Sequence, residues 1–301
     1  MRKEAGKIDE ITIKQRKINK SLIARRCRHY AERNPGLKDL LRFYRKVFSL
    51  QKEAQGSLPR RLPHIEGAQV AYRLDGGELL IKPEELEVDL EVLEGLFKGL
   101  GELFVRRGGD AAGILGSFLE GKGKRELERL VNAFQYKDEE KFLSLAGEEE
   151  AEVVYSLLHL SLAPFYWRMA EPLAKQAPLG QVPRGTCPVC GDLPVMGLIR
   201  SDDGVRILEC SLCGVRWGIP RMICPFCMES DQERLGYLYA ERDRAHRVYI
   251  CDNCHKYLKV TLQESEKEEE IVLALEDLAT MDLDRAAEDR GYLRGCRTAF
   301  S

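Results

Sequence analysis

Residues 187–214 read CPVCGDLPVMGLIRSDDGVRILECSLCG, and this stretch decides the fold of the second half of the chain. A CxxC pair stands at each end, and the two-residue spacing lets one tight turn direct both sulfurs at a single ion. Between the pairs, two apolar runs flank the turn signal Asp203-Gly204, which predicts a β-hairpin. The hairpin would bring its flanking pairs together, so the stretch predicts one four-sulfur metal site.

The pattern occurs again over residues 224–255, where CPFCM and CDNCH flank RLGYLYAERDRAHRVYI. We interpret the two copies as an internal duplication of knuckle, hairpin, knuckle and strand, a knuckle being the turn that holds one CxxC pair. Consecutive knuckles are expected to share an ion because local hairpins close shorter loops, although an interleaved, cross-braced pairing stays open. The predicted ligands are Cys187, Cys190, Cys210 and Cys213 at the first site and Cys224, Cys227, Cys251 and Cys254 at the second.

CDNCH is also the spacing that attaches a c-type haem. In the duplication it aligns with CSLCG, so His255 takes the place of Gly214. With Cys251 and Cys254 committed to an ion, no thiols remain for haem. A further ligand from His255 is disfavoured because four sulfurs already fill a tetrahedral shell.

The N-terminus is charged from Arg2 onward and lacks the apolar segment of a secretory signal, which predicts a cytoplasmic protein. The most apolar run, VVYSLLHLSLAPFYW from Val153, is shorter than a bilayer requires and contains His159 and Pro164. It therefore predicts a buried helix and no membrane association. Because cytoplasmic thiols are kept reduced, the clustered cysteines are expected to bind metal rather than form disulfides.

Apolar residues recur at three- and four-residue steps through the first 180 residues, which predicts helices around 37–48, 92–104, 130–134 and 154–165 and a Gly- and Pro-rich loop over 62–83. A further helix is expected around 271–283, after an acidic run, with Cys296 exposed or loosely packed beyond it. The fold class is thus α+β: an N-terminal α-helical bundle, two tandem rubredoxin-like (zinc-ribbon-like) β-hairpin metal units and a C-terminal helix. The predicted domains are 1–182 for the helices, 183–221 and 222–262 for the metal units, and 263–301 for the C-terminal helix and tail.

The net charge of −2 hides an asymmetry, because residues 1–61 hold 18 Lys and Arg against 6 Asp and Glu. Such a block can bind nucleic acid or an acidic protein surface. Residues 183–262, however, hold 11 Lys and Arg against 10 Asp and Glu, so the metal units carry no basic stripe. A zinc-ribbon nucleic-acid-binding protein is therefore an alternative function, and nucleic acid an unlikely partner. A thiol-disulfide enzyme would need a CxxC free of metal, whereas each CxxC here has a partner pair.

The four CxxC pairs, CPVCG at the start of the series, YLK after its last knuckle and the tail EDLATMDLDRAAEDRGY resemble the formate dehydrogenase accessory protein FdhE family. The resemblance is most specific from about Tyr166 to Tyr292. It implies a cytoplasmic, non-catalytic maturation factor that contacts the catalytic subunit of a molybdenum or tungsten formate dehydrogenase. The eight knuckle cysteines match residue by residue, but Met228 and His255 stand where the first two knuckles have glycine.

Two metal ions per chain are expected. Four thiolates suit iron and zinc alike; rubredoxin-like knuckles favour iron as the functional form, with zinc a possible substitute. Iron would permit one-electron chemistry and zinc only a structural role. Ribbon surfaces near Trp217 and Tyr257 are the candidate contacts with the catalytic subunit, since exposed aromatic side chains on a rigid knuckle make good anchors. The alternative, that either side chain fills the small core of its own ribbon, stays open.

Overall fold

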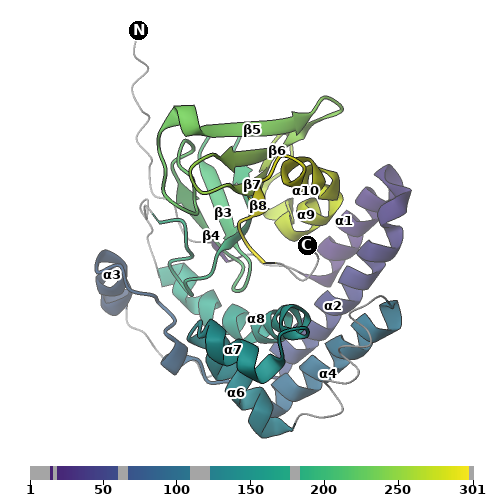
Figure 1. The fold of residues 1–301 in the computed structure, drawn as a ribbon, viewed down its shortest axis with the longest axis vertical. Coiled ribbons are helices and arrows are strands. Elements are labelled where there is room, and N and C mark those ends of the chain that lie inside the picture. Colours follow the sequence, from purple (N-terminus) through teal and green to yellow (C-terminus); the bar gives the residue numbers. More distant parts are fainter. Residues whose placement is uncertain (1–13, 16–18, 60–66, 109–122, 177–183, 298–301) are drawn as a thin grey trace. The chain divides into compact units, whose positions relative to one another are not determined.

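A computed structural model of the chain describes residues 14–15, 19–59, 67–108, 123–176 and 184–297 (Figure 1). The chain divides into two compact units. The sheet unit comprises residues 1–41, 64–80 and 170–297, and the helical unit comprises 42–63, 81–169 and 298–301.

The sheet unit carries all the strands of the described residues. They are β1 (Lys14–Gln15), β2 (Pro194–Ile199), β3 (Arg206–Cys210), β4 (Val215–Ile219), β5 (Leu235–Ala240), β6 (Asp243–Cys251), β7 (Lys256–Leu262) and β8 (Leu293–Arg294). Its helices are α1 (Lys20–Arg33), α3 (Gly67–Asp75), α9 (Leu273–Ala279) and α10 (Met281–Glu288), with short 3-10 turns η1 (Pro35–Leu37), η3 (Gln232–Arg234) and η4 (Glu268–Glu270).

Both predicted hairpins are present. β2 pairs antiparallel with β3, and β5 pairs antiparallel with β6. Gly204 in the first turn has a φ of 69°, the left-handed conformation that glycine adopts without steric cost. A third antiparallel strand follows each hairpin, β4 beside β3 and β7 beside β6. The structure therefore contains the same three-stranded repeat twice.

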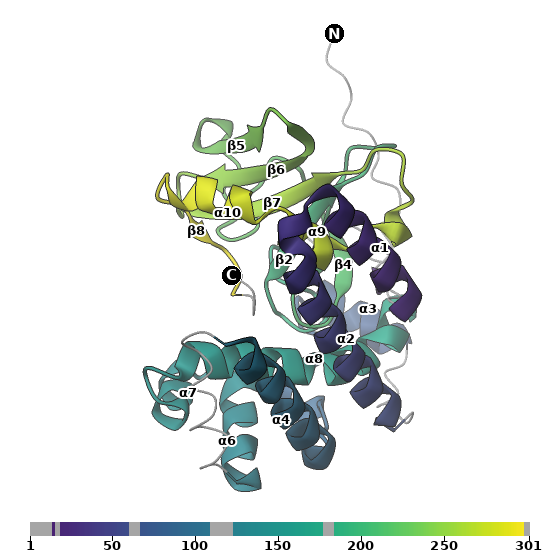
Figure 2. The same ribbon diagram turned by 90° about the vertical axis from the view of Figure 1, so that its right-hand side faces the viewer.

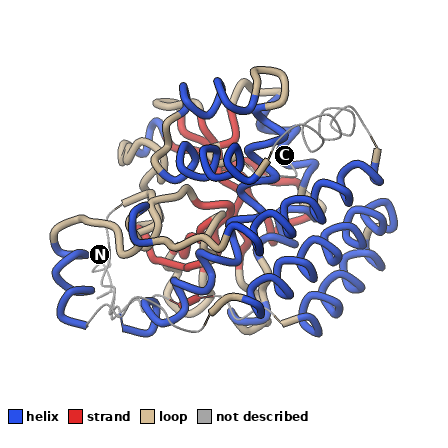
Figure 3. Tube along the Cα trace, turned by 90° about the horizontal axis from the view of Figure 1, so that it is seen from below, coloured by secondary structure: helices blue, strands red, loops and turns tan. Residues whose placement is uncertain are grey.

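The two repeats are joined into one sheet, which the sequence did not predict. The strand order is β1-β4-β3-β2-β7-β6-β5, and β8 adds to β7 in parallel. The junction is a parallel pairing of β2 with β7, in which Gly197 lies opposite Val260 and Ile199 opposite Leu262. The strands lie together in Figure 3, as a continuous sheet requires. Because the joined strands are about sixty residues apart, no local pattern marks their pairing.

The C-terminal region covers the sheet with two short helices instead of the single helix expected. α9 packs on β2 and α10 on β6, and Figure 2 shows α10 beside β6 and β7. The helix breaks at Thr280, where the Lys259 ammonium donates to the backbone oxygens of Asp277 at 2.8 Å and Thr280 at 3.3 Å. Both carbonyls also accept backbone amides, from Thr280 and Leu283 respectively, so Lys259 adds a charged donor to a helix end that the backbone already caps in part. The break is thus stabilised by a side chain from β7.

Cys296 corrects a second expectation about the tail. β8 pairs with β7, and the Gly295 backbone amide donates to the Tyr257 carbonyl at 3.3 Å. This pairing holds the following residue inside the sheet unit, and Cys296 is buried, not exposed or loosely packed. Burial raises the pKa of its thiol.

The helical unit contains most of α2 (Lys38–Ser57) and α8 (Ala151–Gln176), together with α4 (Leu90–Arg107), α6 (Lys124–Gln135), α7 (Glu139–Ala146) and the turn η2 (Pro83–Glu85). The helices predicted by periodicity all form. α4 begins where the Asp89 carboxylate accepts from the amides of Glu91 and Val92, and it ends at Gly108, whose φ is 80°. The most apolar run lies inside α8, where Leu158 and Leu162 are fully buried.

Residues 62–83, predicted as a loop, contain helix α3. Gly67 is the first residue of the helix and Gly76 and Gly77 follow its last, while Val70 in the helix interior is fully buried.

The units also divide the chain differently from the predicted boundary at 182/183. Residues 1–41 and 64–80 fall in the sheet unit. Arg26 of α1 accounts for part of this, since it binds Glu266 at 2.6 Å and Glu276 at 3.0 Å. These ion pairs join residues that lie far apart in the sequence.

Candidate metal centres

The first cysteine cluster lies at one end of the β2–β3 hairpin. Cys187 and Cys190 occupy the turn before β2, Cys210 ends β3, and Cys213 lies in the turn before β4. The Cys187 and Cys213 sulfurs are 3.5 Å apart, those of Cys190 and Cys210 are 3.4 Å apart, and all four lie within 4.8 Å of one another. Sulfurs placed tetrahedrally about 2.3 Å from an ion would be about 3.8 Å apart. The cluster thus has the dimensions of a four-thiolate site.

The second cluster repeats this arrangement at the end of the β5–β6 hairpin. The Cys224 and Cys254 sulfurs are 3.7 Å apart, and those of Cys227 and Cys251 are 3.6 Å apart. All four again lie within 4.8 Å of one another. Consecutive knuckles come together in both repeats, which is the pairing expected from the hairpins and not the interleaved one.

All four knuckles share one backbone turn. In each, the residue after the second cysteine donates its amide to the carbonyl of the first cysteine, at 2.8 to 3.2 Å. That residue has a positive φ in every case: 76° at Gly191, 67° at Gly214, 61° at Met228 and 54° at His255. Met228 and His255 therefore occupy a backbone position that favours glycine.

Burial sets the chemistry of the first cluster. Its four cysteines are all buried, and burial raises the pKa of each thiol, that of Cys210 to about 11. Without a neighbouring cation these thiols would stay protonated at neutral pH, whereas a bound ion of charge +2 or +3 favours the thiolates. The four sulfur donors therefore fit a thiophilic metal, and the closed environment suits a structural site.

The second cluster is more open to solvent. Cys227 and Cys254 are partly exposed. Burial opposes ionisation of Cys227, but hydrogen bonds from the Asn253 side chain and the Glu229 backbone outweigh it and lower the pKa of this thiol to about 7. The Asn253 amide lies 3.6 Å from the Cys227 sulfur. Such donors stabilise a thiolate and orient it, so this cluster fits a metal as well, at a site that solvent can reach.

The two predicted contact residues are not at the surface. Trp217 is only 1% exposed, and its indole donates to the Arg184 carbonyl at 3.2 Å. Tyr257 is 2% exposed, and its hydroxyl donates to Asp284 at 2.9 Å. The prediction of partner contacts at Trp217 and Tyr257 is therefore wrong: both side chains fill the core of the sheet unit, as large aromatic residues commonly do.

Two buried charge networks were missed. Lys259 and Arg294 each bind both Asp277 and Asp284, at 2.5 to 3.0 Å. His246 lies between Asp243 at 2.7 Å and Glu276 at 3.0 Å. Apart from Asp243 and His246, which are three residues apart, the partners come from distant parts of the chain, so no spacing rule could have found the networks.

The fold and the two clusters define a class: a protein in which two four-cysteine knuckle sites stand on a duplicated three-stranded repeat, alongside a helical unit. The family models described as FdhE, central domain, and FdhE, C-terminal domain, match residues 186–221 and 222–300. The chain is 30% identical over 283 residues to Protein FdhE of Salmonella paratyphi A, which covers 92% of this chain and 86% of the relative. Protein FdhE of Escherichia coli O139:H28 is similar to the same extent. The chain belongs to the FdhE family.

A solved structure has the same fold. The crystal structure of the FdhE protein from Pseudomonas aeruginosa matches with a TM-score of 0.64 and 23% sequence identity, and the match covers 96% of this chain and 98% of that one. Among the described residues, no helix is both long and apolar enough to span a membrane.

Proposed function

We propose that this chain is a non-catalytic accessory factor for a formate dehydrogenase and that it binds the catalytic subunit of that enzyme in the cytoplasm. The observation that carries the proposal is membership of the FdhE family, which rests on 30% identity over 92% of the chain. The two four-cysteine clusters support it, because they are the feature through which the sequence resembled formate dehydrogenase accessory proteins.

The metal sites form the second part of the proposal. All eight knuckle cysteines would act as ligands, four to each of two ions. Iron is favoured as the functional metal and zinc is the possible substitute, since four thiolates accept either ion. The closed first site suits a structural role. The second site has partly exposed sulfurs at Cys227 and Cys254, and with iron bound it is the better placed of the two for one-electron exchange.

A different surface takes over the contact role expected of Trp217 and Tyr257. Tyr237 is 48% exposed and Tyr239 is 56% exposed, both on β5 at the edge of the sheet. Their rings lie 6.2 Å apart, and the Arg247 guanidinium lies 4.6 Å from the centre of the Tyr237 ring. Exposed tyrosines on a supported strand lose little side-chain entropy on binding. We assign the contact with the formate dehydrogenase catalytic subunit to these two residues, called here the tyrosine edge.

The alternative, a zinc-ribbon protein that binds nucleic acid, depended on the basic N-terminal block. In the structure, part of that charge is neutralised within the sheet unit. Arg25 binds Glu270 at 2.9 Å and Arg26 binds Glu266 at 2.6 Å, so the acidic run 264–270 partners α1. These pairs weaken the case for a nucleic-acid surface.

A pull-down from cells that make the catalytic subunit tests the proposal. The bait is the full chain, compared with paired Cys→Ser variants at each cluster: Cys187 with Cys190, and Cys224 with Cys227. Cys27→Ser is the matched control, because Cys27 is a buried thiol of α1 outside both clusters. We expect the intact chain and the control to retain the subunit.

Loss of the subunit with a cluster variant, while the control keeps it, would show that recognition needs an intact cluster. Retention of nucleic acid but no subunit by the intact chain would overturn the accessory role. Elemental analysis of the same anaerobically purified samples tests the metal proposal, which requires two ions per chain and fails if the intact chain consistently holds one.

A further inference from the structure

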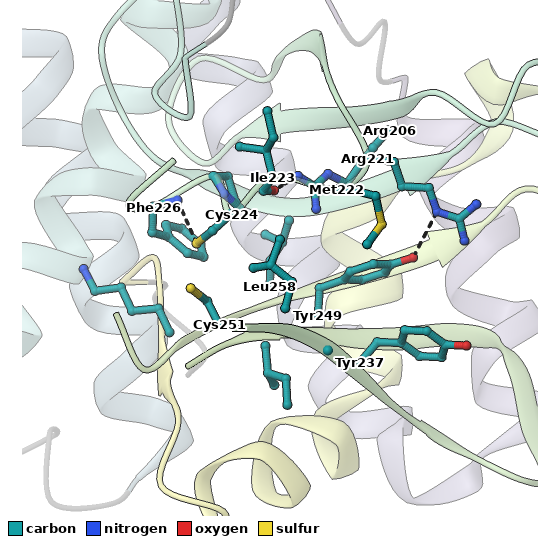
Figure 4. Close-up of a pocket in the computed structure, with 15 residues that line it drawn as sticks. Arg206, Arg221, Met222, Ile223, Cys224, Phe226, Tyr237, Tyr249, Cys251 and Leu258 are labelled. Carbon is teal, nitrogen blue, oxygen red and sulfur yellow. Dashed lines mark hydrogen bonds between the residues drawn. The ribbon is translucent and has the colours of Figure 1, made fainter. Parts of the chain in front are cut away.

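A pocket of about 430 Å³ lies beside the second cysteine cluster, within the sheet unit (Figure 4). The loop 221–226, which carries the third knuckle, forms one side of it. Strands β5, β6 and β7 contribute Leu235, Tyr249 and Leu258, and β3 contributes Arg206. A volume of a few hundred cubic ångströms is the size of ordinary small-ligand pockets. Cys224 and Cys251 of the second cluster and Tyr237 of the tyrosine edge also line it, but neither metal binding nor the edge requires the cavity between them.

The lining combines apolar walls with an excess of positive charge. Besides Phe226, Tyr249 and other apolar side chains, it includes Arg206, Arg221 and Lys256, whereas none of the described residues that line it is an Asp or Glu. An apolar pocket with a few convergent cations favours an anionic ligand that also has an apolar part.

Arg206 is the least expected of the three cations, because it is only 1% exposed. One terminal nitrogen of its guanidinium donates to the Pro220 carbonyl at 3.2 Å and to the Ile223 carbonyl. Its Nε has no hydrogen-bond partner among the described residues. Arg206 also forms no ion pair with any described carboxylate. A buried cation without an ion pair destabilises the fold unless another group offsets its charge.

The groups already around Arg206 compensate it only in part. The Tyr249 ring lies 5.7 Å from the guanidinium, a cation–π contact. Cys224 would add negative charge nearby as a metal-bound thiolate, while Arg221 adds positive charge. None of these supplies the acceptor that Nε lacks, and a planar guanidinium matches a carboxylate better than a point charge would.

We propose that this pocket binds a carboxylate joined to an apolar or aromatic group, with the carboxylate on Arg206 and the apolar group against the walls formed by Phe226, Tyr249 and Leu258. The carboxylate belongs either to a side chain of a peptide or to a free small acid, since both present the same chemistry. Binding is a property of the sheet unit and does not depend on the identity of the client enzyme.

The test compares ligand pairs that differ only in charge, using the metal-loaded full chain. The free-acid pair is 3-phenylpropionate and 3-phenylpropionamide. The peptide pair is N-acetyl-Phe-Asp-amide and N-acetyl-Phe-Asn-amide. Calorimetry or ligand-observed NMR gives the affinities. We expect at least one acid to bind about tenfold or more tightly than its amide partner, the strength of a charge-assisted hydrogen bond. The arm that shows this difference identifies the source of the carboxylate.

Three variants connect the binding to the pocket. Arg206→Gln should abolish the preference for acid over amide, and Lys256→Gln should weaken acid binding several-fold. Arg242→Gln should change nothing, because Arg242 is exposed, pairs with Asp282 and does not line the pocket. Metal content is measured for each variant, so a variant that fails to fold is recognised.

The proposal is overturned if neither acid is preferred over its amide by the intact chain. It is also overturned if the preference survives in a folded, metal-loaded Arg206→Gln variant. If Arg206→Gln loses its metal, the test rests on the intact chain and on Lys256→Gln. An acid affinity that is unchanged in Lys256→Gln then overturns the proposal.

Discussion

His255 occupies in the second repeat the position that Gly214 occupies in the first, and both have a left-handed backbone, with φ values of 54° and 67°. The amide of each donates to the carbonyl of the cysteine four residues earlier, at 2.9 Å for His255 and 3.2 Å for Gly214. The knuckle turn therefore imposes the same backbone whatever the side chain, and Met228 obeys it as well, with a φ of 61°. A side chain at this position costs roughly 1–2 kcal/mol relative to a right-handed conformation.

Met228→Gly should therefore stabilise the second repeat. Relief of the left-handed strain exceeds the extra unfolded-state entropy of glycine, which leaves a net gain on the order of 0.5 kcal/mol. Urea unfolding of the metal-loaded chain would measure it, and Met228 is 38% exposed. The converse change, Gly214→Ala, should destabilise by about 1 kcal/mol. A midpoint lowered by Met228→Gly would contradict this account of the turn.

Chelation should empty the two sites in a fixed order. The first cluster is buried throughout, whereas Cys227 and Cys254 of the second are partly exposed. A chelator can reach an ion only through exposed ligands, so we expect timed treatment to remove the second ion first and to leave an intermediate with one ion per chain. Elemental analysis at intervals follows the release. A chain already lacking the first site through Cys187→Ser and Cys190→Ser should show only the fast phase, and simultaneous loss of both ions from the intact chain would disprove the order.

Stability should decrease at alkaline pH because of His246. Burial alone would lower the pKa of this imidazole, but hydrogen bonds to Asp243 and Glu276 outweigh it and raise the pKa to about 9. Since this value exceeds the unfolded value of about 6.5, the stabilisation is complete below about pH 6.5 and is lost as pH rises through 9. A tenfold difference in proton affinity between the folded and unfolded chain corresponds to about 1.4 kcal/mol.

The measurement is the free energy of unfolding in urea between pH 6 and 10, for the intact chain and for His246→Gln. We expect the intact chain to lose more stability than the variant across this range, by roughly 1–3 kcal/mol. Equal slopes would mean that His246 is not held in its protonated form by the two carboxylates.

Local signals in the sequence were sufficient for the parts of this fold that local chemistry determines. CxxC spacing and the Asp203-Gly204 turn correctly indicated both hairpins and the grouping of cysteines, because each hairpin closes over a short stretch of chain. Helices α2, α4, α6 and α8 followed from apolar periodicity, whereas α7 was not predicted. In these cases the pattern and the contact lie within a single element or a single hairpin.

The features that depend on contacts between distant segments were not predicted. The β2–β7 junction, the Arg26–Glu276 ion pair and the buried pocket cation Arg206 each depend on segments that only tertiary packing brings together. The prediction that Trp217 and Tyr257 are surface contacts was wrong for a related reason. An aromatic residue on a short strand has the same local sequence whether the fold buries it or exposes it. Tyr257 is enclosed by Leu283 and Ala287 of α10, and the Trp217 indole is bonded to the Arg184 carbonyl, so distant segments bury both.

The tyrosine edge provides the last prediction. Tyr237→Ala together with Tyr239→Ala should reduce capture of the formate dehydrogenase catalytic subunit by about tenfold or more, since exposed aromatic anchors carry much of the binding energy in protein interfaces. Both side chains are about half exposed, so their removal should leave folding and metal content unchanged. Tyr72→Ala, which removes a 73% exposed tyrosine from α3, is the matched control. Quantitative pull-down with parallel metal analysis makes the comparison. Undiminished capture by the double variant would show that β5 does not contact the catalytic subunit. Equal losses in the double variant and the control would show that the effect is not specific to β5.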